Sequence, residues 1–337
     1  PILVEVTRGD AVESRHHGAV AIVNAREELV RSLGDVKAPV MPRSAIKSMQ
    51  ALELVETGAA DHFKVSDAEL ALACASHSSE PEHLAAVEIW LDRLGLSESD
   101  LECGAMGSIE EKVHEDLIRS HATLTRLNNN CSGKHAGMLA TALHMGEPTK
   151  GYSQDDHPIQ KRLINILQEM GEVDLSKAPR GCDGCGIPVI AMPLDAMALG
   201  FAKMASPDVM SPSRAAAAKR ITSAIQAHPF MVAGSRRVDT LIIDALNGGP
   251  KGPALVKTGA EGVYGAMLPG LGLGIALKID DGARRAAEVA MVGLLDNLGF
   301  IDERLRHSLA SLIEPVIPNA AGDPVGVVRA TNVIRER

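Results

Sequence analysis

The order of the apolar patterns along this 337-residue chain constrains its fold most strongly. In residues 2–24 the apolar residues alternate and cluster as in two strands, with the turn residues Gly9 and Asp10 between them. Further short runs of this kind, separated by Gly-rich turns, follow at residues 240–246, 254–257, 263–268, 273–279 and 324–330. Both ends of the chain therefore predict strands.

The middle of the chain predicts helices. Helix formers bounded by Ser, Asp, Pro or Gly lie at residues 44–56, 66–76, 81–94, 129–145, 158–170 and 213–227, and a later helix is predicted at 282–298. This order favours one antiparallel sheet formed from N- and C-terminal strands, with helices packed on it. We expect an α+β fold and a single domain over residues 1–337, with a sheet region at 1–41 and 236–337 and a mainly helical region at 42–235.

The composition argues against nucleic acid as a partner. Aromatic residues make up only 2% of the chain, so few rings are available to stack on bases. The net charge of -9, without a Lys/Arg tract, would repel a phosphate backbone. The apolar fraction of 45% predicts a core of Ala, Val, Ile, Leu and Met.

The sequence predicts neither export nor membrane insertion. Residues 1–6 resemble a strand and lack the basic start and apolar run of a signal peptide, and no stretch is apolar for long enough to span a bilayer. The cysteines are odd in number and irregularly spaced: Cys74, Cys103, Cys131, Cys182 and Cys185. This spacing disfavours a disulfide framework and indicates a reducing compartment, so we expect a cytoplasmic protein.

Ser44 and Lys47 lie three residues apart at the start of a predicted helix, which places them on one face, one turn apart. A serine hydroxyl becomes a nucleophile when a base takes its proton, and a lysine amine is such a base if burial or a second cation lowers its pKa. The backbone N–H of Ser44 would be available to an oxyanion. The alternative is an exposed helix start, where S-x-x-K occurs by chance.

Lys257, Thr258 and Gly259 end a predicted strand just before a turn. S-x-x-K followed by K-T-G is the signature pair of the penicillin-recognising serine enzymes, in which the strand lies beside the helix. Lys257 would then be a second cation that keeps Lys47 neutral. Gly259 would allow a close approach of the backbone, and the N–H of Ala260 would complete an oxyanion hole. An ordinary strand-to-turn junction is the alternative for K-T-G alone.

The S-x-N motif expected as the third element of such enzymes is absent from the middle of the chain. In its place, residues 74–80 form a hydroxyl-rich turn between two predicted helices. Ser76 in this turn could pair with Lys257 as a second Ser-Lys couple. A helix end followed by a cap for the next helix is the alternative.

Two polar loops carry sulfur, at residues 128–135 and at the Gly-rich residues 180–186. The C-x-x-C pair in the second loop is typical of redox sites and of metal loops, and no thioredoxin-like βαβ pattern surrounds it. A structural or accidental role is equally open. From spacing alone, a tetrahedral zinc site would take its ligands, with water, from Cys131, Cys182, Cys185 and His135.

Taken together, these motifs closely resemble the L-asparaginase II family, the rhizobial-type inducible asparaginases related to serine glutaminases and β-lactamase-like Ser-Lys enzymes. The resemblance runs nearly end to end and rests on residues 43–47, the turn around Ser76, and residues 129–135, 182–186 and 257–259. It implies a serine β-lactamase-like fold, a homodimer, and hydrolysis of L-asparagine to L-aspartate and ammonia. The single domain would then be catalytic.

The resemblance also implies the roles of individual residues. Ser44 would be the nucleophile with Lys47 as its base, and Ser76 would form the second pair with Lys257. Arg43, with His135 and Asp183, would contact the substrate or support the site.

The same resemblance implies zinc as the cofactor, bound by Cys131, Lys134 and Cys185. This set differs from the set based on spacing, because a neutral lysine amine replaces His135. Lys134 follows Cys131 by one turn and can present nitrogen to the same ion. Cys182 is left without a role.

Three other functions fit part of the pattern. A glutaminase or another small-amide hydrolase would use the same residues. A penicillin-type peptidase would need the missing S-x-N motif and export. A zinc-binding regulatory or interaction protein would explain the cysteines but not the two Ser-Lys sets. The expected partner is therefore a small molecule, L-asparagine, and neither nucleic acid nor a membrane.

Overall fold

The computed structural model describes residues 1–336, which form two compact units. The first, here called the sheet unit, contains Pro1–Ala45, Met192–Ser206 and Ile242–Arg337. The second, called the helical unit, contains Ile46–Ala191 and Pro207–Leu241.

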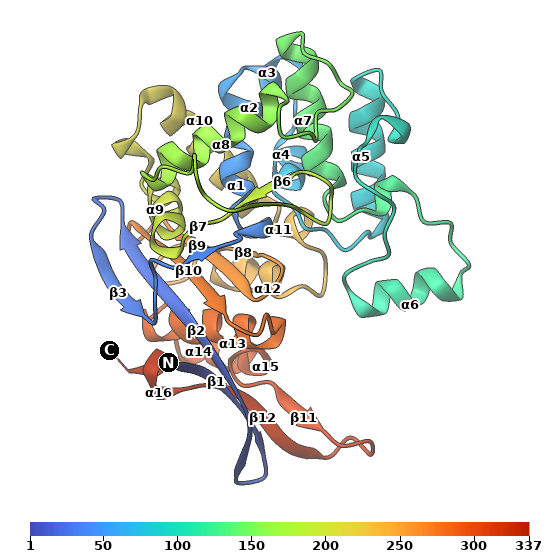
Figure 1. Ribbon diagram of the computed structural model, residues 1–337. Helices are drawn as coiled ribbons and strands as arrows, with labels where there is room; N and C mark the ends of the chain where they lie inside the picture. Colours follow the sequence, from blue (N-terminus) through green and yellow to red (C-terminus); the bar gives the residue numbers. More distant parts are fainter. Residues whose placement is uncertain (337) are drawn as a thin grey trace. The chain divides into compact units, whose positions relative to one another are not determined.

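The sheet unit is built on an antiparallel sheet whose strands come from both ends of the chain (Figure 1). Its main path follows the order β11, β12, β1, β2, β10, β9, β8, and β3 pairs with β2. The strands are β1 (Ile2–Arg8), β2 (Ala11–Asn24), β3 (Leu29–Leu33), β8 (Leu255–Thr258), β9 (Val263–Leu268), β10 (Leu273–Ile279), β11 (Val316–Pro318) and β12 (Pro324–Ala330). The predicted α+β fold, with an antiparallel sheet of N- and C-terminal strands, is confirmed.

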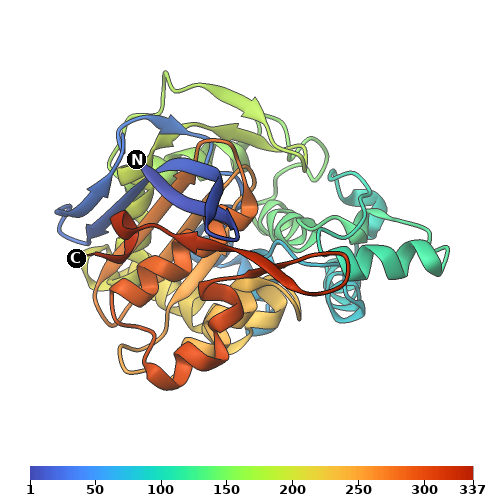
Figure 2. The ribbon, with the colours of Figure 1, turned by 90° about the horizontal axis from the view of Figure 1, so that it is seen from below.

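The two ends of the chain meet in this sheet. Strand β1 pairs with β12 in the register Val4 to Ala330, and the N–H of Thr331 donates to the carbonyl oxygen of Leu3. Figures 1 and 2 show the first and last strands side by side. Strand β8, which carries the K-T-G motif, lies at the opposite end of the strand order and pairs only with β9 in the described sheet.

Two helices cover the sheet. Helix α9 (Leu194–Ala205) packs on β2, β9 and β10, and α13 (Arg284–Asn297) packs on β1, β9, β10 and β12. Gly274 permits the approach of α9, because a Cβ atom there would lie 2.0 Å from the carbonyl oxygen of Ala198. Every residue of β9 is buried, so both faces of the sheet are covered at that strand.

The sheet unit is completed by short elements. Three short helices lie near the C-terminal end: α14 (Glu303–Ser308), α15 (Ala310–Ile313) and α16 (Asn332–Arg335). Strand β4 (Pro39–Val40) pairs with β7 (Met192–Pro193) just before the helical turn that carries Ser44.

The helical unit holds most of the predicted helices. They are α1 (Lys47–Gln50), α2 (Leu52–Glu56), α3 (Ala59–His62), α4 (Asp67–Ala73), α5 (Pro81–Arg93), α6 (Glu111–Arg119), α7 (Ser132–Met145), α8 (Pro158–Gly171), α10 (Pro212–Ala227) and α11 (Pro229–Val232). A small hairpin of β5 (Arg180–Cys182) and β6 (Pro188–Ile190) carries the second sulfur loop. Helix α6 has no buried residue and stands apart from the other helices of this unit (Figures 1 and 2).

Charged side chains join the helices inside this unit. Arg162 of α8 contacts the carboxylate of Glu53 on α2 at 2.7 Å and that of Glu147 at 2.6 Å. Burial raises the pKa of Glu53 to about 7, although the Arg162 guanidinium acts to lower it. The hydrogen bond from Arg162 lowers the pKa of the more exposed Glu147. One arginine therefore serves two acids whose pKa values move in opposite directions.

One predicted strand is wrong. Residues 240–246 belong to helix α12 (Val238–Leu246), in which Leu241 and Asp244 are exposed while Ile242, Ile243 and Leu246 are buried. Exposed positions three residues apart follow a helical period, which a seven-residue apolar run does not reveal by itself. The elements that were not predicted include helices α6 and α9, strands β3 and β11, and the short elements β4–β7 and α14–α16. Within residues 1–336, no helix is long and apolar enough to cross a membrane.

Candidate active site

The two sulfur loops of the helical unit bring two thiols and one amine together. Cys131 immediately precedes helix α7, Lys134 lies in its first turn, and Cys185 lies in the turn between β5 and β6. The Lys134 amine donates to the Cys185 sulfur at 3.0 Å, and Cys131 hydrogen-bonds to Cys185. All three side chains are buried.

The protonation of these groups is coupled. The hydrogen bond from Cys131 lowers the pKa of Cys185, and the nearby Lys134 ammonium lowers it further. The same hydrogen bond, together with burial, raises the pKa of Cys131. Burial acts to lower the pKa of Lys134, but the two thiols and Asp183 outweigh it and raise the pKa of this amine. The cluster thus favours a thiolate at Cys185 beside a protonated lysine.

This donor set fits a soft metal ion. Cys185 is hydrogen-bonded both to the Lys134 amine and to Cys131, and these two sulfurs and one nitrogen resemble the ligands that zinc prefers. Binding of the ion would displace the lysine proton. The set based on spacing alone does not form, because the described residues contain no metal-binding group of three or more His, Cys, Asp or Glu side chains. Cys182 is exposed, and its thiol donates to the carbonyl oxygen of Asp183 at 3.6 Å.

Lys47 connects this cluster to the hydroxyl-rich turn. As the first residue of α1 it is buried, and its amine donates to the carbonyl oxygen of Ala75 and to Oγ of Ser76, the latter at 3.1 Å. The same amine lies 3.1 Å from the sulfur of Cys131. Sequence reasoning paired Ser76 with Lys257 and missed this contact with Lys47.

The turn that carries Ser76 is rigidly held. The backbone N–H of Ser76 donates to the carbonyl oxygen of Val232, and the backbone N–H of His77 donates to the carbonyl oxygen of Asn130. The His77 ring contacts Oγ of Ser132 at 2.8 Å, and burial lowers its pKa well below the usual value. These bonds join the Ser76 turn to the start of α7, so the serine and the thiol loop have fixed relative positions within this unit.

His135 and Asp183 lie beside the thiols and the lysine. The buried ring of His135 makes a 2.6 Å contact with the hydroxyl of Tyr152, and burial lowers its pKa to about 3, so the ring is neutral. Asp183 accepts a hydrogen bond from the backbone N–H of Gly184 at 2.8 Å, and its other oxygen lies 3.9 Å from the Cys185 sulfur.

In the sheet unit, Ser44 follows a residue with unusual backbone geometry. Arg43 has φ = 50°, the left-handed region that a residue other than glycine enters at a cost of about 1–3 kcal/mol. Such strain is found most often at functional sites. Ser44 is half-buried in the short helix η1 (Arg43–Ile46), and α1 begins directly after it.

The K-T-G strand lies against this helical start within the sheet unit. A Cβ atom on Gly259 would lie 2.9 Å from the carbonyl oxygen of Pro42 and 3.2 Å from the backbone nitrogen of Ala45. Lys257 is buried, and its amine donates to the carbonyl oxygen of Thr258 at 2.7 Å. Only a residue without a side chain permits this approach, so Gly259 allows the strand end to lie against Pro42 and Ala45, the residues on either side of Arg43 and Ser44.

The predicted site residues therefore fall into two sets. The sheet unit contains Arg43, Ser44, Lys257, Gly259 and Ala260, of which Ala260 is exposed. The helical unit contains Lys47, Ser76, Cys131, Lys134, His135, Asp183 and Cys185. Ser44 and Lys47 occupy consecutive helical segments. That the two sets act as one site, in one catalytic domain, stays a prediction.

Three residues of the hydrogen-bond network were missed from sequence: Tyr152, Glu102 and Ser132. None lies at a spacing that indicates chemistry. Tyr152 could have been singled out nevertheless, because it is one of only two tyrosines in the chain. A buried tyrosine hydroxyl usually has a hydrogen-bond partner.

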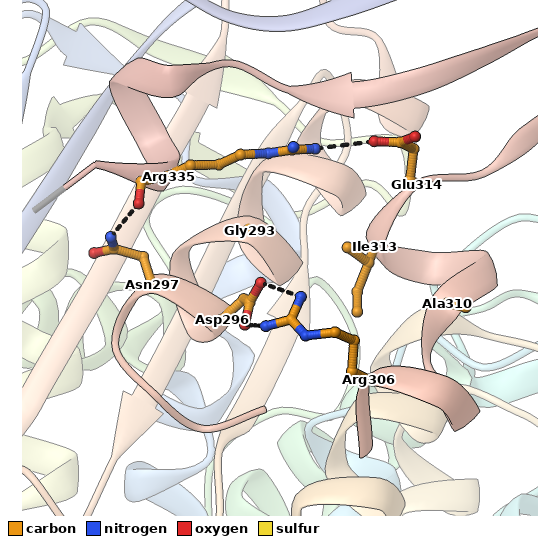
Figure 3. A pocket seen from close by; sticks show the side chains of 8 residues that line it. All are labelled: Gly293, Asp296, Asn297, Arg306, Ala310, Ile313, Glu314 and Arg335. Carbon is orange, nitrogen blue, oxygen red and sulfur yellow. Dashed lines mark hydrogen bonds and ion pairs between the residues drawn. The ribbon is translucent and has the colours of Figure 1, made fainter. Parts of the chain in front are cut away.

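A large hollow lies elsewhere in the sheet unit (Figure 3). It measures about 600 Å³, and none of the predicted site residues lines it. Its charged side chains pair with one another: Arg306 with Asp296 at 2.5 Å, and Arg335 with Glu314 at 3.1 Å. The charges at its wall are therefore already satisfied, and the buried polar cluster is the better candidate.

Comparisons with known proteins give one family and several solved structures. The chain is similar to a putative β-lactamase from Bacteroides dorei, with 13% identity, coverage of 78% of this chain and 84% of that one, and a TM-score of 0.40. It is 12% identical to a β-lactamase from Mycobacterium bovis, with coverage of 88% of this chain and 95% of that one and a TM-score of 0.38. It is 14% identical to the D-alanine carboxypeptidase AmpC from Burkholderia cenocepacia, with coverage of 82% of this chain and 93% of that one and a TM-score of 0.40.

No curated protein sequence matches the chain. The family model of L-asparaginase II matches residues 4–330, almost the whole sequence and all of the predicted site residues. By this match the protein is a hydrolase that belongs to the L-asparaginase II family.

Proposed function

We propose that this hydrolase cleaves the side-chain amide of L-asparagine to give L-aspartate and ammonia, with Ser44 as the nucleophile. The family match supports the substrate. The observation that carries the mechanism is the contact of Gly259 with Pro42 and Ala45, because it brings the K-T-G strand end beside the backbone of Ser44. The same residues would serve a glutaminase, so turnover of L-asparagine and L-glutamine must be compared.

The proposed reaction proceeds through an acyl-enzyme. Ser44 Oγ attacks the amide carbon as its proton passes to the Lys47 amine, and the tetrahedral intermediate is stabilised by the backbone N–H groups of Ser44 and Ala260. The intermediate collapses, the proton passes to the leaving nitrogen, and ammonia departs from a β-aspartyl ester. Water then attacks the ester, which releases L-aspartate and restores the Ser44 hydroxyl.

Ser76 and Lys257 are proposed to take part in proton transfer during these steps. The hydrogen bond from Lys47 to Ser76 supports a path from the amine to a second hydroxyl. Lys257 is proposed as the partner of Ser76, with which it would form the second Ser-Lys pair. Arg43 is proposed to contact the substrate, as are His135 and Asp183 in the cluster around the thiols.

Cys131, Lys134 and Cys185 are proposed to hold zinc. When bound there, the ion would supply a fixed positive charge that attracts and orients the substrate. The chain's own groups do the bond making, since a serine is the nucleophile. A homodimer and a cytoplasmic location stay predictions.

The first experiment removes the nucleophile. Ser44→Ala should abolish ammonia release from L-asparagine, while the circular dichroism spectrum and the zinc content remain those of the unaltered protein. Substrate should still bind, as calorimetry can measure. An active Ser44→Ala enzyme would falsify the assignment of Ser44.

The second experiment tests the metal with two cysteines of one loop. Cys185→Ser should lower zinc content measured by elemental analysis, because it removes a sulfur ligand from the cluster. The matched control is Cys182→Ser, an exposed cysteine three residues away, which should keep full zinc content. Equal zinc content in both variants would contradict the proposed ligand set.

A further inference from the structure

Tyr152 is a buried tyrosine that no step above requires. It lies between α7 and α8, and its ring is 0% exposed. Its carbonyl oxygen accepts a hydrogen bond from the buried Gln160 at 2.8 Å. The carboxylate of Glu102 accepts hydrogen bonds from the backbone N–H groups of its two neighbours, Gly151 and Ser153. The backbone around this tyrosine is therefore clamped on both sides.

The tyrosine hydroxyl has two partners, and they fix the direction of its hydrogen bonds. The backbone N–H of Glu102 donates to the hydroxyl oxygen at 2.8 Å. Nδ1 of His135 lies 2.6 Å from the same oxygen. If Nδ1 carried a hydrogen, both partners would donate and the hydroxyl hydrogen of Tyr152 would be buried without an acceptor, which costs about 1–3 kcal/mol. The hydroxyl therefore donates to Nδ1.

This direction determines the state of the His135 ring. Because Nδ1 accepts and carries no hydrogen, the one ring hydrogen lies on the other nitrogen, Nε2. Nε2 is buried and has no hydrogen-bond partner among the described residues. The structure thus contains a buried N–H donor, built by an ordered relay, that lacks an acceptor.

The place of this donor points to a ligand. His135 is the next residue after Lys134 on α7, and it interacts electrostatically with Lys134, Cys131 and Lys47. A buried donor without an acceptor is costly and persists mostly at functional positions. L-asparagine offers two kinds of acceptor, the amide oxygen and the α-carboxylate. The amide oxygen is assigned above to the backbone N–H groups, which leaves the carboxylate.

We propose that Tyr152 is a positioning residue: it holds His135 in the tautomer with hydrogen on Nε2, so that the ring donates a hydrogen bond to the α-carboxylate of the substrate. The identity of the substrate rests on the proposed function, whereas the relay from Glu102 through Tyr152 to His135 does not. A neutral donor of this kind selects an acceptor by direction rather than by charge.

The relay is tested by nitrogen NMR of the histidine rings. In ¹⁵N-labelled protein, His135 should show a protonated Nε2 and an unprotonated Nδ1, with its signals identified by their loss in His135→Gln. Tyr152→Phe removes only the hydroxyl, so hydrogen should appear on Nδ1. The matched control is Tyr264→Phe, the other tyrosine, which is also buried and lies on β9 in the sheet unit. It should leave the His135 signals unchanged.

The substrate contact is tested by kinetics in the same variants. Tyr152→Phe should raise KM for L-asparagine roughly tenfold with a smaller change in kcat, because a correctly directed hydrogen bond to a charged oxygen is lost. 3-Aminopropanamide, which lacks the carboxylate, should inhibit the unaltered enzyme and Tyr152→Phe with the same inhibition constant. Tyr264→Phe should change neither value.

Each result decides one part of the proposal. An unchanged His135 tautomer in Tyr152→Phe would overturn the relay. A changed tautomer with equal effects on L-asparagine and 3-aminopropanamide would overturn the carboxylate contact. If the unaltered protein hydrolysed no amide, the proposed function would fall with that contact, while the NMR comparison would still decide the relay.

Discussion

The two units of this protein bury different kinds of side chain. In the sheet unit the interior around β9 and β10 is apolar, and Lys203 and Lys257 are exceptions. In the helical unit most helices contribute buried polar groups, among them Lys47, Lys134 and His135. Burying such groups is costly unless they are paired. Lys47 donates to a backbone oxygen, Lys134 donates to the Cys185 sulfur, and His135 is bonded to Tyr152 through Nδ1, while its Nε2 is left without a partner among the described residues. Buried groups with shifted pKa values, such as Lys134 and His135, are found often at functional sites.

The strongest test of this contrast compares two buried lysines. Lys47→Met in the helical unit should reduce kcat/KM by about 10³-fold, because it removes the proposed base and its bond to Ser76. Lys203→Met on α9 of the sheet unit is the matched control and should keep activity within a few-fold. Steady-state ammonia release measures both, and equal losses would remove the functional distinction between the units.

A second test measures how the buried carboxyl group of Glu53 makes the unfolding free energy depend on pH. Because burial raises the pKa of Glu53 to about 7, its folded state holds the proton more tightly than the unfolded chain does. The resulting stabilisation is present below about pH 4.5 and is lost as the pH rises through 7, by up to about 3 kcal/mol. Glu53→Gln should abolish this part of the slope when urea unfolding is measured against pH.

Glu147, on the same arginine, gives the opposite sign. Its pKa is lowered by the bond from Arg162, so its contribution to stability is present above its unfolded pKa and lost as the pH falls. Glu147→Gln should therefore reduce stability near neutral pH and not in acid. Parallel slopes for the two variants would contradict the assignment of burial as the dominant cause at Glu53.

The smallest expected effect concerns backbone geometry in the sheet unit. Gly259→Ala should cost about 2 kcal/mol of unfolding free energy and lower kcat, because its Cβ would press on Pro42 and Ala45. Gly104→Ala is the control, since no atom lies within 4 Å of a Cβ there. Thermal unfolding and ammonia release follow both variants. Indistinguishable behaviour would mean that close packing at Gly259 is dispensable.

Local patterns predicted the sheet better than the site. The bounds of β9, β10 and β12 agree with the predicted strands, because each is a short run of apolar residues limited by Gly or Pro. Helix α12 was mistaken for a strand, since seven apolar-rich residues satisfy either period. Helix α9 was missed although it covers the sheet.

The site contacts were harder to predict because they join distant segments. Motifs identified Ser44, Lys47 and the two sulfur loops, but not the bond between Lys47 and Ser76, which are far apart in sequence. The bond between His135 and Tyr152 depends on how the turn before α8 packs on α7. Such contacts follow from tertiary packing, and no residue spacing encodes them.

The pairing of β1 with β12 has a consequence for how the molecule is made. On the ribosome, the hairpin of β1 and β2 emerges well before β10 and β12, the strands with which it pairs. Contacts between segments so far apart in sequence form slowly, and strand edges that remain unpaired are prone to aggregation. The helical unit is translated between these strands, so the nascent chain must keep β1 and β2 soluble, or protected by a chaperone, until β10 and β12 have been made.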